Sequence, residues 1–98
     1  MLHIINKSPL EKNTLESCLS VATAGSTLLL IEDAVYAATR GNAFEARLQA
    51  AQGRFKICVL TPDLEARGMA DRLMAGVTGI DYGGFVDLAA ENKCQSWL

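Results

Sequence analysis

Three cysteines are the side chains of this 98-residue chain with the clearest capacity for chemistry, because a thiolate is a strong nucleophile. They lie at positions 18, 58 and 94 without any CxxC pair, and His3 is the only histidine. This odd number and wide spacing disfavour both a zinc site and a disulfide framework. We therefore expect three free thiols and no metal site, and the question is which thiol is reactive.

Cys18 lies in an expected helix over residues 14–23, one turn from Leu15 and Ala22. This spacing puts it on or beside the apolar face of the helix. Free cysteine at such a position commonly serves as a small buried apolar residue. A reactive thiol needs a lowered pKa and some exposure, but Cys18 is more than a turn from the helix start and Glu16 supplies no positive charge.

The other candidate side chains have structural interpretations. Cys58 lies in the middle of an expected buried strand, which predicts core packing. Cys94 follows the last expected helix, as an accessible surface thiol. His3 lies in the first expected strand, where alternation puts it opposite Leu2 and Ile4. Because no serine or cysteine is paired with it in the sequence, we expect a hydrogen-bonded structural histidine rather than a catalytic base.

Short apolar runs alternate with helical stretches, which is typical of a parallel sheet covered by helices. The apolar run at 27–31 is typical of a strand buried on both faces. The expected strands are 2–5, 27–31, 56–60 and 77–81, and the expected helical segments are 14–23, 34–39, 43–52, 64–68, 69–74 and 85–92. Asn13 and Glu16 are placed to form a capping box on the first helix. The predicted fold class is α/β, with three layers and a mainly parallel sheet of four to five strands.

Polar and acidic residues follow each expected strand. When parallel strands are joined by right-handed crossovers, the residues that follow the strands meet at one edge of the sheet, where doubly wound folds usually place their functional sites. The segments concerned are 6–8, 32–33, 61–63 and 81–82. One hypothesis is a stand-alone enzyme that uses an acidic crevice there. The other is that Asp33 and Asp63 cap the helices that follow them, as loop carboxylates commonly do.

Bulk properties narrow the function further. The length fits a single domain over residues 1–98, and the formal net charge is −2 with a pI of about 5.2. Lys and Arg form no basic stripe, so we expect no direct contact with nucleic acid. The longest apolar run is too short to cross a membrane, and no secretory leader is evident, which predicts a cytoplasmic protein. No glycine-rich phosphate or dinucleotide loop follows a strand, so no organic cofactor is indicated.

Three aromatic residues near the C-terminus are candidates for contacts. Tyr82 and Phe85 are placed either for packing of the last helix on the core or for a subunit interface. Trp97 lies one residue from the C-terminus. Because chain ends usually fray, it can make a stable contact only where the end of the chain is packed or paired. Because interfaces are enriched in aromatic anchors, we expect Trp97 to make a subunit contact or to pack on the edge of its own sheet.

Five segments carry a resemblance to a known family, and together they span nearly the whole chain in order. They are Met1-Leu2-His3-Ile4-Ile5-Asn6-Lys7-Ser8-Pro9, Glu32-Asp33-Ala34-Val35-Tyr36-Ala37-Ala38, Thr61-Pro62-Asp63-Leu64-Glu65-Ala66-Arg67-Gly68, Ile80-Asp81-Tyr82-Gly83-Gly84-Phe85-Val86-Asp87-Leu88 and Gln95-Ser96-Trp97-Leu98. In these segments the chain resembles the DsrH/TusB family, and most of all DsrH of the DsrEFH complex. The resemblance implies a DsrEFH-like domain with flavodoxin-like topology.

The resemblance also implies a function in persulfide relay, without a cofactor, in a cytoplasmic heterohexameric sulfurtransferase complex. The implied partners are DsrE/TusD-like and DsrF/TusC-like subunits, with DsrC/TusE-like and TusA-like sulfur carriers acting through the complex. The essential cysteine of such complexes is in the DsrE/TusD subunit. This chain is then a non-catalytic or auxiliary subunit, with Cys18 as a candidate secondary persulfide carrier and Trp97 as a docking element.

Three functional hypotheses remain open within this resemblance. The first is a DsrEFH-like role in sulfur oxidation, which the segments at 6–9 and 81–88 and the cysteine at position 18 favour. The second is a TusB-like role in the 2-thiolation of the tRNA wobble uridine. The third is a purely structural interaction subunit without thiol chemistry.

Overall fold

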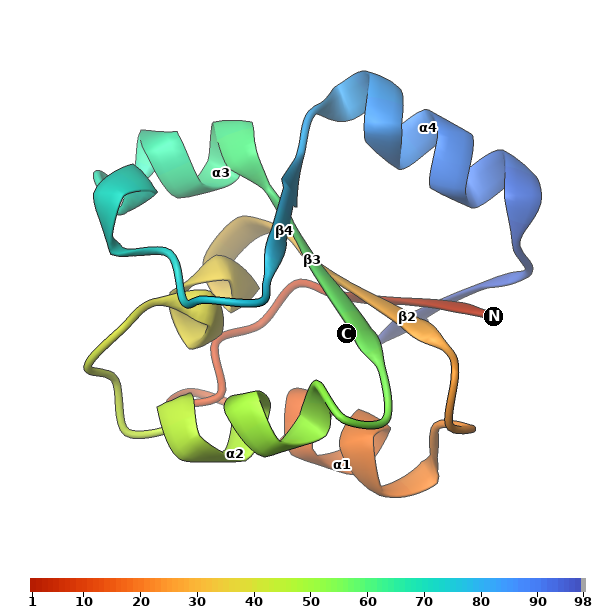
Figure 1. The fold of residues 1–98 in the computed structure, drawn as a ribbon, viewed down its shortest axis with the longest axis horizontal. Coiled ribbons are helices and arrows are strands. Elements are labelled where there is room, and N and C mark those ends of the chain that lie inside the picture. The colour runs from red at the N-terminus through yellow and green to blue at the C-terminus, as the bar shows by residue number, and fades with distance from the viewer. Residues whose placement is uncertain (98) are drawn as a thin grey trace.

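The computed structural model describes residues 1–97 and contains one five-stranded sheet in which all strand pairs are parallel. The strands are β1 (Leu2–Ile5), β2 (Thr27–Leu30), β3 (Lys56–Leu60), β4 (Thr78–Ile80) and β5 (Cys94–Trp97). The helices are α1 (Thr14–Val21), α2 (Glu45–Ala51), α3 (Thr61–Ala66) and α4 (Tyr82–Glu91), with 3-10 turns η1 (Glu32–Ala38) and η2 (Ala70–Arg72). The predicted α/β class and the parallel sheet are confirmed (Figure 1).

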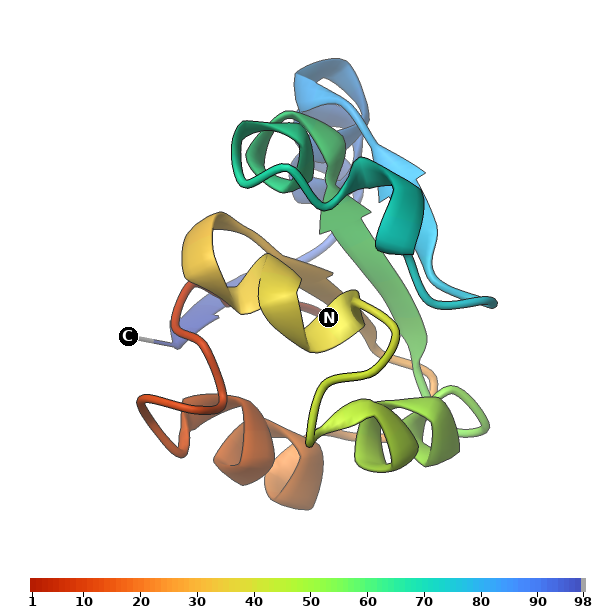
Figure 2. The same ribbon diagram turned by 90° about the vertical axis from the view of Figure 1, so that its left-hand side faces the viewer.

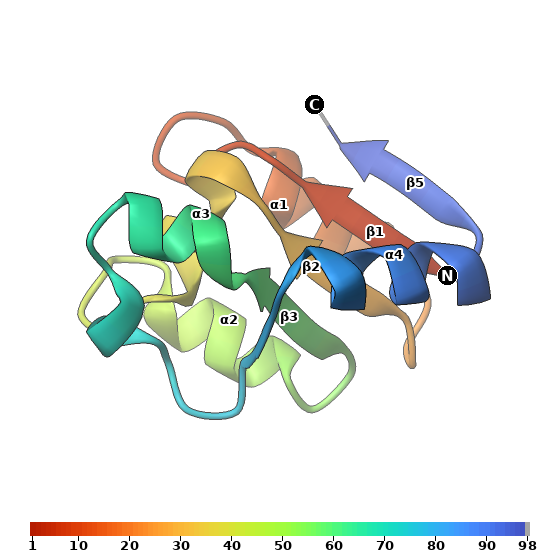
Figure 3. The same ribbon diagram turned by 90° about the horizontal axis from the view of Figure 1, so that it is seen from above.

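The strand order is β4-β3-β2-β1-β5, which differs from the 2-1-3-4-5 order of flavodoxin. The chain steps in one direction from β1 to β4, and the last crossover returns across the sheet to place β5 beside β1 (Figure 3). Because right-handed crossovers in opposite directions lie on opposite faces, α4 is the one helix within residues 1–97 on the second face of the sheet. This topology leaves the two faces of the sheet unequally covered by helices.

The core reflects this inequality. The larger cluster lies between the sheet and the connections β1–β2, β2–β3 and β3–β4, and includes Leu15, Leu28, Leu48 and Met74. Figure 2 shows η1 between α2 and α3 in this region, and η1 packs on both helices. The smaller cluster on the second face has only three buried members, and the side chains from α4 that cover it are half-buried. The buried members are Leu2, Leu29 and Cys58, and the covering residues from α4 are Phe85 and Leu88.

The last strand is the element that the sequence analysis did not predict. The α4 helix ends at Glu91 as expected, within a residue, but the chain then pairs with β1 instead of fraying. The pairing starts with a hydrogen bond from the Leu2 amide to the Lys93 carbonyl, 2.8 Å long. The segment Cys94–Trp97 is polar and mostly exposed, so it lacks the apolar pattern from which strands are predicted.

The starts of α1 and α3 differ from the predictions, and α4 begins at Tyr82 rather than at residue 85. The side chain of Asn13 makes no capping hydrogen bond, and Glu16 instead forms an ion pair with Arg47 of α2. The third helix begins at Thr61 rather than at Leu64, because Pro62 is favourable in the first turn of a helix. At α1 the contact of Glu16 with α2 sets the local geometry, and at α3 the proline sets it.

Candidate functional site

Cys18 lies inside the larger core cluster, with no part of its side chain exposed. Burial raises the pKa of this thiol to about 11. A thiol with that pKa is thiolate in a fraction on the order of one part in ten thousand at pH 7. In this conformation Cys18 has the environment of a small apolar residue, without the access and the lowered pKa that a sulfur carrier needs.

The other two cysteines differ from each other in exposure. Cys58 is buried in the smaller cluster, and burial raises its pKa while the nearby Lys56 charge opposes that shift. Its predicted core position is confirmed. Cys94 is exposed at the start of β5, and its sulfur lies 3.7 Å from the Asn92 carbonyl oxygen. Cys94 is therefore the accessible thiol of the three, as the sequence analysis expected.

Two acidic residues at the carboxyl edge of the sheet, Asp33 and Asp63, bond to other segments instead of capping their own helices, whereas Asp81 caps α4 by accepting a hydrogen bond from the Gly84 amide at 2.8 Å. Asp63 accepts a hydrogen bond from the Glu32 amide, with a length of 2.7 Å. Glu32 has a φ of +49°, a left-handed conformation that is uncommon outside glycine. Asp33 forms an ion pair with Arg67, at 2.9 Å. The two carboxylates thus join the loops after β2 and β3, and the expected capping role is not observed.

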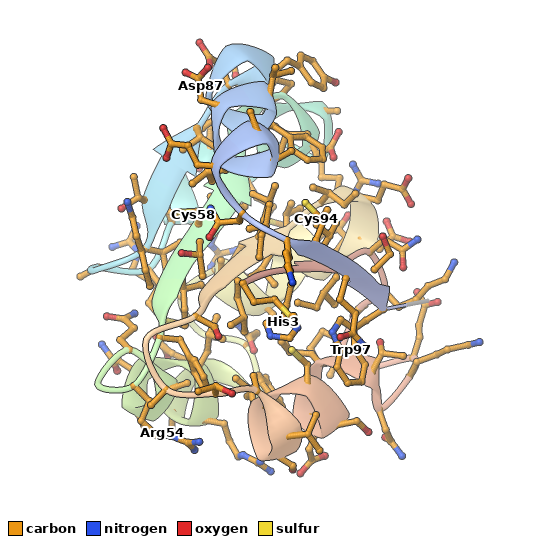
Figure 4. All side chains as sticks on the ribbon, turned by 90° about the vertical axis from the view of Figure 1, so that its right-hand side faces the viewer. His3, Arg54, Cys58, Asp87, Cys94 and Trp97 are labelled. Carbon is orange, nitrogen blue, oxygen red and sulfur yellow. The ribbon has the colours of Figure 1, made fainter. Side chains whose placement is uncertain are left out.

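His3 and Trp97 form one hydrogen-bonded pair between β1 and β5. The Trp97 indole N–H donates to His3 Nδ1 at 3.0 Å, and the ring centroids are 6.1 Å apart (Figure 4). Burial, followed by the positive charge of the N-terminus, lowers the pKa of His3. The predicted structural role of His3 is confirmed, and Trp97 packs on the edge of its own sheet, which is one of the two predicted positions.

The exposed face of α4 carries the remaining aromatic candidates. The side chain of Tyr82 is 59% exposed, whereas Phe85 is half-buried against the smaller core cluster. Val86, which the sequence analysis did not single out, is 66% exposed on the same helix. A valine in a helix gives no sequence signal of exposure by itself, since it suits a core position equally well. These three residues place apolar surface on and beside the one helix of the second face.

The described residues offer neither a metal site nor a membrane-spanning helix. Within residues 1–97 no group of three or more His, Cys, Asp or Glu side chains could hold a metal ion. Among the helices of this same part of the chain, none is long and apolar enough to cross a membrane.

The sequence pattern of the family described as "DsrH like protein" matches residues 7–95. The chain belongs to this DsrH-like family. Among curated relatives, Protein TusB of Pectobacterium parmentieri is 38% identical over 95 residues, which cover 97% of each chain. Protein TusB of Escherichia coli O81 (strain ED1a) is 35% identical over 95 residues, with the same coverage. The predicted membership of the DsrH/TusB family, and with it a place among subunits of sulfur-relay complexes, is confirmed.

Solved structures share the fold of this DsrH-like chain at low sequence identity. The ychN protein of Escherichia coli has a TM-score of 0.77 at 17% identity, and the match covers 98% of this chain and 97% of that one. The protein MTH1491 of Methanobacterium thermoautotrophicum has a TM-score of 0.70 at 18% identity, with coverage of 97% and 95%. These likenesses establish the fold alone.

Proposed function

We propose that this chain is an architectural subunit of a cytoplasmic heterohexameric sulfur-relay complex, and that its partners supply the sulfur-carrying cysteine. The observation that carries the proposal is the incomplete burial of the second sheet face, where α4 is the one helix within residues 1–97 that packs on the apolar residues. A chain of this size gains stability when apolar surface is buried by a partner. The partners are the DsrE/TusD-like and DsrF/TusC-like subunits that the family implies, and sulfur passes to DsrC/TusE-like and TusA-like carriers through them.

The interface of this proposal is the α4 face. Tyr82 and Val86 present apolar surface to solvent, and Phe85 links that surface to the buried cluster beneath the helix. Aromatic residues with adjoining aliphatic ones are the usual anchors of protein interfaces. Trp97 lies at the edge of the sheet, where its half-buried ring adds a second apolar contact for a neighbouring subunit.

The acceptor pathway of the proposal is tRNA wobble uridine 2-thiolation. The curated relatives that share 35–38% identity with this chain carry the name TusB, and this favours thiolation over the sulfur-oxidation role that the segments at 6–9 and 81–88 suggested first. The negative net charge fits a subunit that acts without touching the tRNA itself.

Substituting Val86→Asp is expected to reduce assembly with the partner subunits at least tenfold. A carboxylate at the centre of an apolar contact would be desolvated without a counter-charge, which costs several kcal/mol. Co-purification of tagged partners from the same host, followed by size-exclusion chromatography, measures the loss. Val21→Asp is the matched control, because Val21 is 67% exposed on α1 on the other side of the sheet. Equal assembly of both variants would contradict the proposed interface.

Deleting the gene in its host is expected to remove most of the 2-thiouridine from tRNA, and a Cys18→Ala gene is expected to restore it. A thiol that is fully buried with a raised pKa makes a poor sulfur acceptor, and removing it costs on the order of 1 kcal/mol of stability. Mass spectrometry of tRNA nucleosides measures the outcome. If the Cys18→Ala gene did not restore 2-thiouridine although the complex still assembled, Cys18 would be identified as a sulfur carrier. Unchanged 2-thiouridine in the deletion strain would favour the sulfur-oxidation pathway.

A further inference from the structure

A crevice of about 570 Å³ lies at the carboxyl edge of the sheet, away from the three cysteines and from the α4 face. Its walls come from the loop after β1, from η1, from the loop that follows η1, and from the connection between β3 and β4. Its lining includes Leu10, Glu11, Tyr36, Arg40, Met69 and Arg72. The volume suits a small organic molecule. Segments 6–8 and 32–33 were predicted to meet at this edge, and Ser8 and Asp33 line the crevice, but the basic and apolar residues from the other segments were not predicted to join them.

The backbone of the crevice is held by hydrogen bonds that join the loop after η1 to η1 itself and to η2. The Arg40 amide donates to the Arg72 carbonyl at 2.8 Å, and the Arg40 guanidinium donates to the Asp71 carbonyl at 2.7 Å. Asn42 donates from its side-chain amide to the carbonyls of Tyr36 and Ala37, at 3.3 and 3.2 Å. The backbones of Arg40 and Arg72 thus lie side by side, and the Arg40 guanidinium is held by the Asp71 carbonyl, while the Arg72 side chain is exposed.

The charges that line the crevice favour an anion. Within residues 1–97, neither Arg40 nor Arg72 forms an ion pair, although both line the crevice. Two carboxylates also line it, but Asp33 is neutralised by its ion pair with Arg67. Glu11 remains as the opposing charge. Among the side chains that line the crevice, two unpaired guanidinium groups accompany one unpaired carboxylate, and Glu45 adds a negative charge at the border, where its carboxylate accepts a hydrogen bond from the Gly41 amide at 3.1 Å.

One side of the crevice is apolar. Leu10 is 71% exposed at its rim, and Tyr36 and Met69 are half-buried in its wall. A ligand that covered Leu10 would remove this apolar surface from water, at about 25 cal/mol for each Å² covered. A bare inorganic ion would leave it exposed. The arrangement therefore suits a ligand with a charged head and an apolar body.

We propose that this crevice binds a small organic anion, whose phosphate or carboxylate head contacts Arg40 and Arg72 and whose flat apolar body lies against Leu10, Tyr36 and Met69. Arginine pairs bind both kinds of head through charge-assisted hydrogen bonds. The site is separate from the α4 face, so ligand binding is an additional property that does not depend on the architectural role.

Titration of the ¹⁵N-labelled full chain with phenyl phosphate, followed by NMR, tests the proposal. Saturable shifts are expected at the amides of Arg40, Gly41 and Arg72, with an affinity at least several-fold above that of inorganic phosphate. Phenylacetate as a second probe shows whether a carboxylate head serves as well as a phosphate head. Linear shifts spread over the surface, or no preference for phenyl phosphate over inorganic phosphate, would overturn the proposal.

Four variants make this test specific. Arg72→Gln and Arg40→Gln are expected to weaken phenyl phosphate binding at least tenfold, and Arg72 is the safer choice since its side chain makes no hydrogen bond within residues 1–97. Glu11→Gln is expected to tighten binding about twofold, because it removes the opposing charge. Arg54→Gln is the control, because Arg54 stacks on Phe55 outside the crevice. If Arg54→Gln weakened phenyl phosphate binding equally, the effect would be due to the general positive charge of the surface and not to the crevice.

Discussion

Iodoacetamide at pH 7 is expected to alkylate Cys94 at least a hundred times faster than Cys18 in the folded chain. The reagent reacts with thiolate, and an ordinary exposed thiol is about 3% ionised at this pH. Burial raises the pKa of Cys18 to about 11, which lowers its ionised fraction by a factor of several hundred. Cys18 is also closed to the reagent itself, whereas Cys94 is exposed.

Mass spectrometry of tryptic peptides from a timed reaction measures both rates in one sample. Cys58 serves as an internal control, because it is buried on the opposite face of the sheet and is expected to react as slowly as Cys18. In guanidinium chloride the three cysteines are expected to react at similar rates. Rapid modification of Cys18 alone in the native chain would mean that α1 opens often enough to expose it, and would revive its role as a carrier.

The same experiment with a persulfide donor extends the result to sulfur transfer. Transfer of sulfur needs the thiolate of the acceptor as well, so the order of reactivity among the three cysteines is expected to be the same. A gain of one sulfur on Cys94 alone would then reflect exposure rather than function. We therefore expect Cys18 to take no sulfur in the native fold.

The core could be predicted from the sequence where burial is regular. The apolar runs at 27–31 and 56–60 became central strands, because a strand covered on both faces needs apolar residues throughout. The spacing of Cys18 from Leu15 and Ala22 placed it on the apolar face of its helix, and all three are buried. These predictions succeeded because the apolar residues recur at the spacing that places them on the core-facing side along the whole element.

Contacts between distant segments could not be predicted in this way. The hydrogen bond from Glu32 to Asp63 joins positions 31 residues apart, and helix-start statistics suggested instead that Asp63 caps its own helix. The edge strand β5 has no apolar pattern, since its stability comes from hydrogen bonds to β1. The candidate crevice depends on the pairing of Arg40 with Arg72, which exists only after folding.

Removing the Trp97 side chain is expected to cost about 2 kcal/mol of unfolding free energy in Trp97→Ala, below the range for a fully buried aromatic because Trp97 is half-buried. Trp97→Phe keeps most of the apolar contact but removes the indole N–H, so it is expected to cost about 1 kcal/mol. Urea unfolding at pH 8 measures both values. A loss below about 0.5 kcal/mol in Trp97→Ala would mean that β5 contributes little to the fold.

The pH dependence of these variants tests the His3–Trp97 hydrogen bond directly. His3 Nδ1 accepts from the indole, so the folded chain holds this nitrogen unprotonated, and burial lowers the pKa of His3 below its usual 6.5. A base with a lowered folded pKa contributes its full stability above pH 6.5, and the contribution is lost as the pH falls below 6.5. Unfolding free energies measured between pH 8 and pH 5 are expected to fall over this window in the natural chain. In Trp97→Ala the decline is expected to be smaller, because water replaces the ring and His3 can bind a proton while folded. An identical decline in both proteins would assign the pH dependence to groups other than His3.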